Sequence, residues 1–155
     1  MTQPFLYSVE REYEVDINQL WAAWVDPHAL QIWYSPVELS VVPGSVTSEP
    51  RVGGAWSVAV DASKFGFNAY FWGLYTAVVE ERLLEHTMLY TQDDAEFAAR
   101  DLSGPSHLVR IEFEERGSAS WVKFSQFGEL PGGEPERAKA GMESYFDNLG
   151  SYLQR

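Results

Sequence analysis

Histidine is the side chain best suited to acid–base or metal chemistry near neutral pH, and this chain has three. They lie far apart, at His28, His86 and His107, without the paired spacing of metal ligands, so we expect no metal site. His86 alternates with Leu84 and Met88, which predicts that its ring points into the covered face of a sheet. His86 is therefore a candidate for a buried acid or base.

Carboxylates and nucleophiles give little support to catalysis. The densest carboxylates, Glu80-Glu81 and those at 112–115, lie at turns or on a polar strand face, where solvation explains them. Asp61, at the end of a predicted strand, is a candidate polar group at the mouth of a cavity. The chain has no Cys and no Gly-x-Ser-x-Gly motif, and Gly53-Gly54 precedes a strand rather than the helix of a phosphate loop. These patterns do not favour an enzyme.

Aromatic residues make up 15% of the chain, with six Trp, eight Tyr and nine Phe. This is more ring surface than a compact core of this size needs, and it indicates a lined cavity or an interface. Gln126 follows Phe124 on one strand face, where its polar group needs a partner or a ligand. Trp72 alternates out of phase with Phe71, which predicts that it lies on the exposed face and favours a protein contact.

The element that must position these residues is a helix predicted over 135–153. Pro135 suits a first helical turn, Glu134 and Glu136 suit the positive end of the helix dipole, and Gly132-Gly133 end the preceding segment. One face of this helix is apolar and consists of Ala138, Met142, Tyr145, Phe146, Leu149, Tyr152 and Leu153. We expect this face to close the core.

The chain before this helix is rich in strands. Residues 5–15 alternate as a strand, and Asp16, with Gln19 in a capping box, and Asp26-Pro27 mark the starts of two short helices. The later expected strands are 37–47 (interrupted near Pro43-Gly44), 55–61, 67–79, 83–91, 107–115 and 120–128, with a helical turn at 94–100. Hairpin-linked strands form an antiparallel sheet with one face covered. The predicted fold class is α+β, with six or seven strands in a single domain of residues 1–155.

The charge is strongly negative, at −12 from 11 Lys+Arg against 23 Asp+Glu. Such a field repels phosphate, so we expect no nucleic-acid partner and no contact with an anionic membrane. No stretch has the roughly 20 apolar residues of a membrane span, and the first five residues lack the pattern of a signal peptide. With no Cys to form disulfides, the expected location is the cytoplasm.

The order of several short motifs resembles the START-like (SRPBCC) superfamily, and within it the branch related to the C-terminal domain of the heat-shock protein 90 ATPase activator. The motifs are 16–24, Asp26-Pro27 followed by Trp33, Gly53-Gly54-Ala55-Trp56, Gly73, and 135–153. The resemblance implies a helix-grip fold, a curved sheet around the long C-terminal helix with an apolar cavity between them. It implies small apolar ligands for many relatives and protein contacts for some, with no shared catalytic set, metal or organic cofactor. The longer connection at 92–106 departs from a simple hairpin.

The resemblance and the surplus of rings lead to one main hypothesis, the non-catalytic binding of a small apolar or aromatic ligand. The predicted ligand-binding residues are Trp33, Trp56, Phe71, Tyr75, His86, Phe124, Gln126, Met142, Tyr145 and Phe146. The alternatives are a co-chaperone-like domain that contacts a heat-shock ATPase, and a cyclase or aromatase type of enzyme that uses His86 or Asp61. A homodimer is the default oligomer.

Overall fold

The computed structural model describes residues 3–130 and 134–154, so the glycine pair at 132–133 lies outside the described residues. Its elements, in chain order, are β1 (Phe5–Tyr13), α1 (Ile17–Val25), α2 (Pro27–Trp33), β2 (Ser40–Val41), β3 (Thr47–Ser48), β4 (Ala55–Ala62), a 3-10 turn (Ser63–Phe65), β5 (Phe67–Val79), β6 (Leu83–Thr91), α3 (Asp94–Ala99), β7 (His107–Arg116), β8 (Ala119–Phe127) and α4 (Glu134–Leu153). Within these ranges no helix is both long and apolar enough to cross a membrane.

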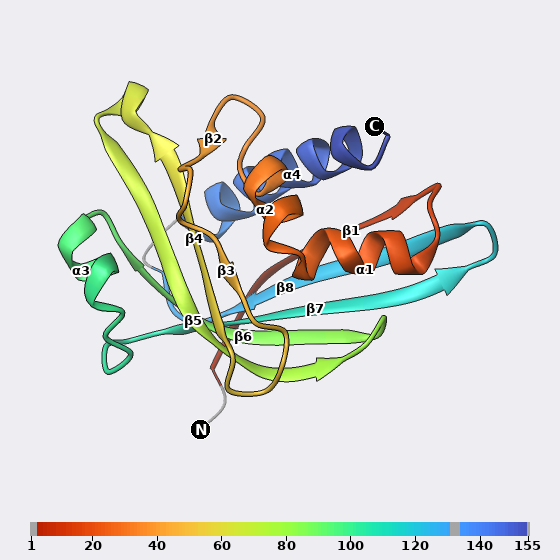
Figure 1. Cartoon of the computed structure of the whole chain (residues 1–155), viewed down its shortest axis with the longest axis horizontal. Coiled ribbons are helices and arrows are strands. Elements are labelled where there is room, and N and C mark those ends of the chain that lie inside the picture. Colours follow the sequence, from red (N-terminus) through yellow and green to blue (C-terminus); the bar gives the residue numbers. More distant parts are fainter. Residues whose placement is uncertain (1–2, 131–133, 155) are drawn as a thin grey trace.

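The strands form one curled antiparallel sheet in the order β1-β8-β7-β6-β5-β4-β2, with β3 also paired to β4. Helices α1, α2 and α4 lie together on one side of the sheet, and α3 lies beyond β5 on the other (Figure 1). The α+β helix-grip fold is therefore confirmed.

The number of strands differs from the prediction because the segment 37–47 is not one strand. It contains the two-residue strand β2 and the first residue of the two-residue strand β3, and both strands pair with β4. Gly44 between them has a positive φ of 80°, a conformation that ends regular pairing. The eight strands of the sheet thus comprise six long ones and these two short ones.

The two short helices begin where expected, but only one has a side-chain cap. Asp26 accepts a hydrogen bond from the backbone N–H of His28, and Pro27 occupies the first helical position. Asp16 makes no such bond, contrary to the prediction. The N–H of Gln19, which a capping side chain would bind, donates instead to the backbone carbonyl of Asp16 at 3.1 Å.

Helix α4 is anchored on both of its flanks. On the β1 side, Arg11 pairs with Asp147 at 2.6 Å and with Glu143 at 2.9 Å. On the α2 side, the amide of Asn148 donates to the carbonyl oxygens of Trp33 and Ser35. These contacts orient the helix, and the buried side chains of its inner face are Met142, Phe146, Leu149 and Leu153.

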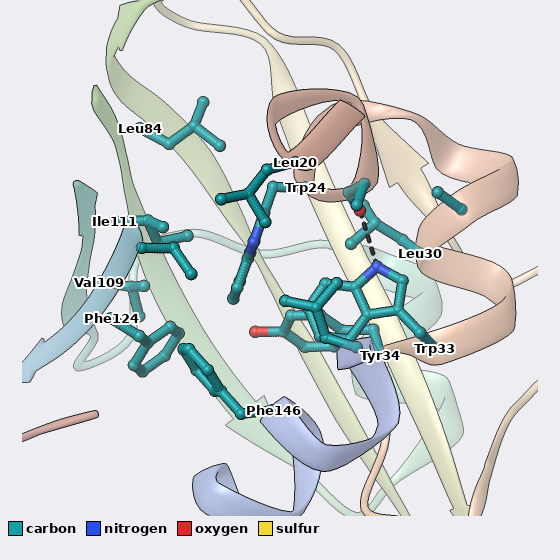
Figure 2. Packing of buried hydrophobic residues seen from close by; sticks show 14 of the residues in the cluster. Leu20, Trp24, Leu30, Trp33, Tyr34, Leu84, Val109, Ile111, Phe124 and Phe146 are labelled. Carbon is teal, nitrogen blue, oxygen red and sulfur yellow. Dashed lines mark hydrogen bonds between the residues drawn. The ribbon is translucent and has the colours of Figure 1, made fainter. Parts of the chain in front are cut away.

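The core between the helices and the sheet is filled with rings (Figure 2). Trp24 lies at its centre, with ring centroids 4.7 Å from Trp33, 5.8 Å from Phe146 and 6.2 Å from Phe124. The indole N–H of Trp33 donates to the carbonyl of Ala23 at 2.7 Å, the dashed line in Figure 2. This half of the core is solid, because its large side chains pack against one another.

Trp72 points to the opposite face of the sheet, as predicted, but the prediction that it is exposed is wrong. It is only 5% exposed and belongs to a second apolar cluster with Ala59, Leu89 and Phe97. Its indole N–H donates to the carbonyl of Asp101 at 3.1 Å. The connection 92–106 forms helix α3 and covers this tryptophan, which no alternation pattern on β5 could reveal.

We predict that Phe146→Ala lowers the free energy of unfolding by about 3–5 kcal/mol, because Phe146 is fully buried against Trp24. The exposed Glu136→Ala on the same helix is the matched control and should change stability little. Urea unfolding followed by circular dichroism measures both variants, and equal losses would contradict this account of α4.

Candidate functional site

A partly open cavity of about 190 Å³ lies between the sheet and the first turns of α4. Its walls are Tyr7 from β1, Phe71 from β5, Met88 from β6, Phe124 and Gln126 from β8, Tyr34 after α2, and Ala138, Gly141, Met142 and Tyr145 from α4. The space exists because Ala138 and Gly141 are small, whereas the next turns of the same helix carry Phe146 and Leu149, which fill the core.

Half of the predicted ligand-binding residues lie at this cavity. Phe71, Phe124, Gln126, Met142 and Tyr145 line it together, from three separate elements. The others pack inside the core and do not reach it; they are Trp33, Trp56, Tyr75, His86 and Phe146, each no more than 3% exposed. All ten side chains point inward, but the cavity occupies only one end of the interior.

His86 is a packed core residue rather than a cavity residue. Its ring stacks on Trp56 with centroids 3.9 Å apart, and its Nδ1 lies 2.8 Å from the carbonyl oxygen of Thr87. Because a carbonyl only accepts, Nδ1 carries the proton. Burial disfavours the charged ring and lowers the pKa of His86 to about 4. His86 thus has no route to a ligand in this cavity.

Asp61 also lies away from the cavity. Its carboxylate accepts a hydrogen bond from the backbone N–H of Ser63 at 2.9 Å, at the turn that follows β4. The hydrogen bonds from Ser63 lower the pKa of Asp61. The hypothesis of a cyclase or aromatase type of enzyme therefore loses both of the residues on which it depended.

Gln126 has protein partners at both ends of its amide. The hydroxyl of Tyr7 donates to its Oε1 at 2.7 Å, and its Nε2 donates to Nδ1 of His107, also at 2.7 Å. The Nε2 of His107 lies 3.3 Å from the carbonyl oxygen of Glu129, so this nitrogen carries the proton. The cavity wall is thus tied to the start of β7 by a chain of hydrogen bonds that fixes the orientation of the amide.

Sequence reasoning missed five wall residues, namely Tyr7, Tyr34, Met88, Ala138 and Gly141. Tyr7 and Met88 belong to strands whose alternating pattern places them on the inner face, so the sequence could have predicted that their side chains point inward. Gly141 follows Ala138 by three positions on the apolar face of the last helix, and such small residues leave space beside them. Tyr34 lies just beyond α2, where no helical or strand pattern in the sequence indicates the direction of its side chain.

The family comparison gives a clear result. The family model described as "Activator of Hsp90 ATPase homolog 1-like protein" (AHSA1) matches residues 14–154. The chain belongs to the AHSA1 family. The match includes every wall residue of the cavity except Tyr7. The resemblance to the START-like superfamily, read from the order of the motifs, is thereby confirmed.

Solved structures share this fold at low sequence identity. A protein from Chromobacterium violaceum has a TM-score of 0.79 at 19% identity, with 96% of each chain covered. The AHSA1 protein from Silicibacter pomeroyi has a TM-score of 0.78 at 23% identity, again with 96% of each chain covered. CalU16 from Micromonospora echinospora has a TM-score of 0.66 at 16% identity, covering 94% of this chain and 74% of the other. No protein with a curated description matches the chain.

The AHSA1-family chain groups no three His, Asp or Glu side chains in a way that could hold a metal ion, within residues 3–130 and 134–154. The side chains at its cavity are phenols, apolar groups, a thioether pair and one amide, all of them uncharged. Such a lining recognises shape, apolar surface and hydrogen bonds rather than charge.

We predict that His86 makes this AHSA1-family protein less stable in acid. Because the pKa of His86 is about 4 in the folded chain and near 6.5 in the unfolded one, the unfolded chain binds more protons between these values. The unfolding free energy therefore falls as the pH drops from 6.5 to 4, by about 3 kcal/mol from this residue.

The variants His86→Gln and His28→Gln separate this effect from other titrations. Urea unfolding at pH 7 and pH 4.5 should show a smaller acid loss for His86→Gln, whereas the exposed His28→Gln should lose as much as the wild type. Identical pH dependence in all three proteins would show that His86 does not resist protonation.

Proposed function

We propose that this protein binds a small apolar or aromatic molecule, without transforming it, in the cavity between the sheet and α4. The observation that carries the proposal is a cavity of about 190 Å³ whose walls come from strands at opposite ends of the chain and from the last helix. An apolar cavity of about 150 Å³ suffices to bind benzene in another protein, so this one suits a ligand of about one ring.

The chemistry of the walls supports binding rather than catalysis. General acid–base catalysis works best with a group whose pKa lies near the operating pH. The described wall residues include no carboxylate, amine or imidazole, and burial raises the pKa of Tyr7, Tyr34 and Tyr145 above the usual value for a phenol. These tyrosines stay protonated at neutral pH and offer hydrogen bonds instead of proton transfer.

A contact with a heat-shock ATPase is the competing proposal, and the family description supports it. The aromatic residue expected to contact such a partner, Trp72, is covered by α3, which weakens this alternative. Retention of a heat-shock ATPase on the immobilised protein, with a change in ATPase rate, would favour this alternative. A homodimer stays a prediction, which light scattering on the purified protein tests.

We predict that a panel of one-ring apolar molecules raises the melting temperature, by roughly 5–10 °C for a ligand at 100 times its Kd. The variant Gly141→Leu should abolish this shift, because a Cβ at Gly141 meets no atom within 4 Å and Gly141 lines the cavity. Its side chain would fill the space that the ligand needs while the fold is kept.

The matched control is Ala140→Leu, which adds the same bulk at an exposed position of α4 and should retain the shift. Circular dichroism confirms that both variants are folded. If no molecule of the panel shifts the wild type, or if Gly141→Leu binds as the wild type does, the cavity is not a binding site.

A further inference from the structure

We propose that the cavity selects a neutral one-ring ligand with a carbonyl oxygen, which accepts hydrogen bonds from the hydroxyl groups of Tyr34 and Tyr145. This inference rests on the proposed function and specifies its ligand class. It comes from two phenols that line the same space, the buried Tyr34 and the partly buried Tyr145, whose hydroxyls have no hydrogen-bond partner among the described residues.

Tyr34 is held rigidly with its hydroxyl directed into the interior. Its side chain is only 4% exposed, and its ring lies between those of Trp33, at 5.2 Å, and Trp56, at 5.9 Å. Figure 2 shows the hydroxyl oxygen pointing away from α2 towards the side of the core where Phe124 lies, and Phe124 is another wall of the cavity. Because Tyr34 lines the cavity and its hydroxyl has no protein partner among the described residues, this hydroxyl is available to a ligand.

Tyr145 stands against Tyr34, with the two rings edge to face and their centroids 5.1 Å apart. Other tyrosines of the interior engage protein acceptors or donors: Tyr7 binds Gln126, Tyr13 binds the carbonyl of Phe146, and Tyr75 binds Ser48. The described residues provide no such partner for the hydroxyls of Tyr34 and Tyr145. Both rings line the cavity, and Tyr145 contributes to the raised pKa of Tyr34, which indicates that the two phenol groups lie near each other.

A carbonyl oxygen matches this pair of donors. It has two lone pairs and can accept from both hydroxyls at once, whereas a hydrocarbon that displaced water from the cavity would leave both donors without a partner. The remaining walls, Phe71, Phe124 and Met88, supply apolar surface for the ring that carries the carbonyl group. The volume of about 190 Å³ limits the ligand to about one ring.

The absence of cationic side chains from the described walls disfavours ligands that carry a carboxylate in place of the neutral carbonyl group. No Arg, Lys or His stands among the described walls, so a bound carboxylate would lose its hydration without gaining a counter-ion. Burial raises the pKa of both phenols, which keeps them neutral and able to donate. The chain as a whole, at −12, also repels anions.

The test compares three probes of nearly the same shape, acetophenone, ethylbenzene and benzoate, by calorimetric titration of the full chain. We expect acetophenone to bind about tenfold more tightly than ethylbenzene, and benzoate to bind more weakly than either. Tyr34→Phe and Tyr145→Phe should each weaken acetophenone about fivefold and leave ethylbenzene unchanged. The control Tyr152→Phe, on α4 but outside the cavity, should alter neither affinity.

Infrared spectra of bound acetophenone give a second readout that a merely structural role would not move. The carbonyl stretch should shift to lower frequency in the wild type and return towards its value in an apolar solvent in each cavity Tyr→Phe variant. Equal binding of acetophenone and ethylbenzene, or tighter binding of benzoate, would overturn the inference and leave the proposed function standing. If neither acetophenone nor ethylbenzene binds, both the inference and the proposed function are wrong.

Discussion

The structure depends on the burial of one face of α4 in the curled sheet, and this face changes character along the helix. Its C-terminal half carries Phe146, Leu149 and Leu153, which pack on Trp24 and its neighbours and leave no room. Its N-terminal half carries Ala138 and Gly141, which cannot reach the sheet. A single helix therefore both closes the core and forms the cavity, and the boundary between the two lies within two helical turns.

The polar groups of the cavity wall fall into two kinds that serve the cavity differently. Gln126 is satisfied by Tyr7 and His107 and is part of the scaffold, because both ends of its amide are committed. Tyr34 and Tyr145 are held in place by ring packing instead, which leaves their hydroxyls available. The cavity thus combines an apolar wall, an amide committed to protein partners and two hydroxyl donors without a protein partner among the described residues, and it has no charged group.

Local patterns predicted the fold well, because alternation and helical spacing need no knowledge of partners: the bounds of β5 and β6 agree with the predicted 67–79 and 83–91. The same patterns predict which way a side chain points, but not whether it lies in the packed core or at the cavity. Trp33 and Phe71 both point inward, yet one is in the solid core and the other at the cavity. The predictions of an exposed Trp72 and of a capping Asp16 side chain were wrong for a related reason. Helix α3 covers Trp72, and the N–H of Gln19 donates to the backbone carbonyl of Asp16 instead of its carboxylate.

The second apolar cluster, on the far side of the sheet, has a consequence for the dynamics of the molecule. Phe97 is the one side chain of the six-residue helix α3 that is buried, and it stacks on Tyr70 and lies edge-on to Trp72. None of these residues belongs to the cluster around Trp24. We therefore expect the cover formed by 92–106 to open locally, so that its amide protons exchange with solvent while the ring-filled interior stays closed.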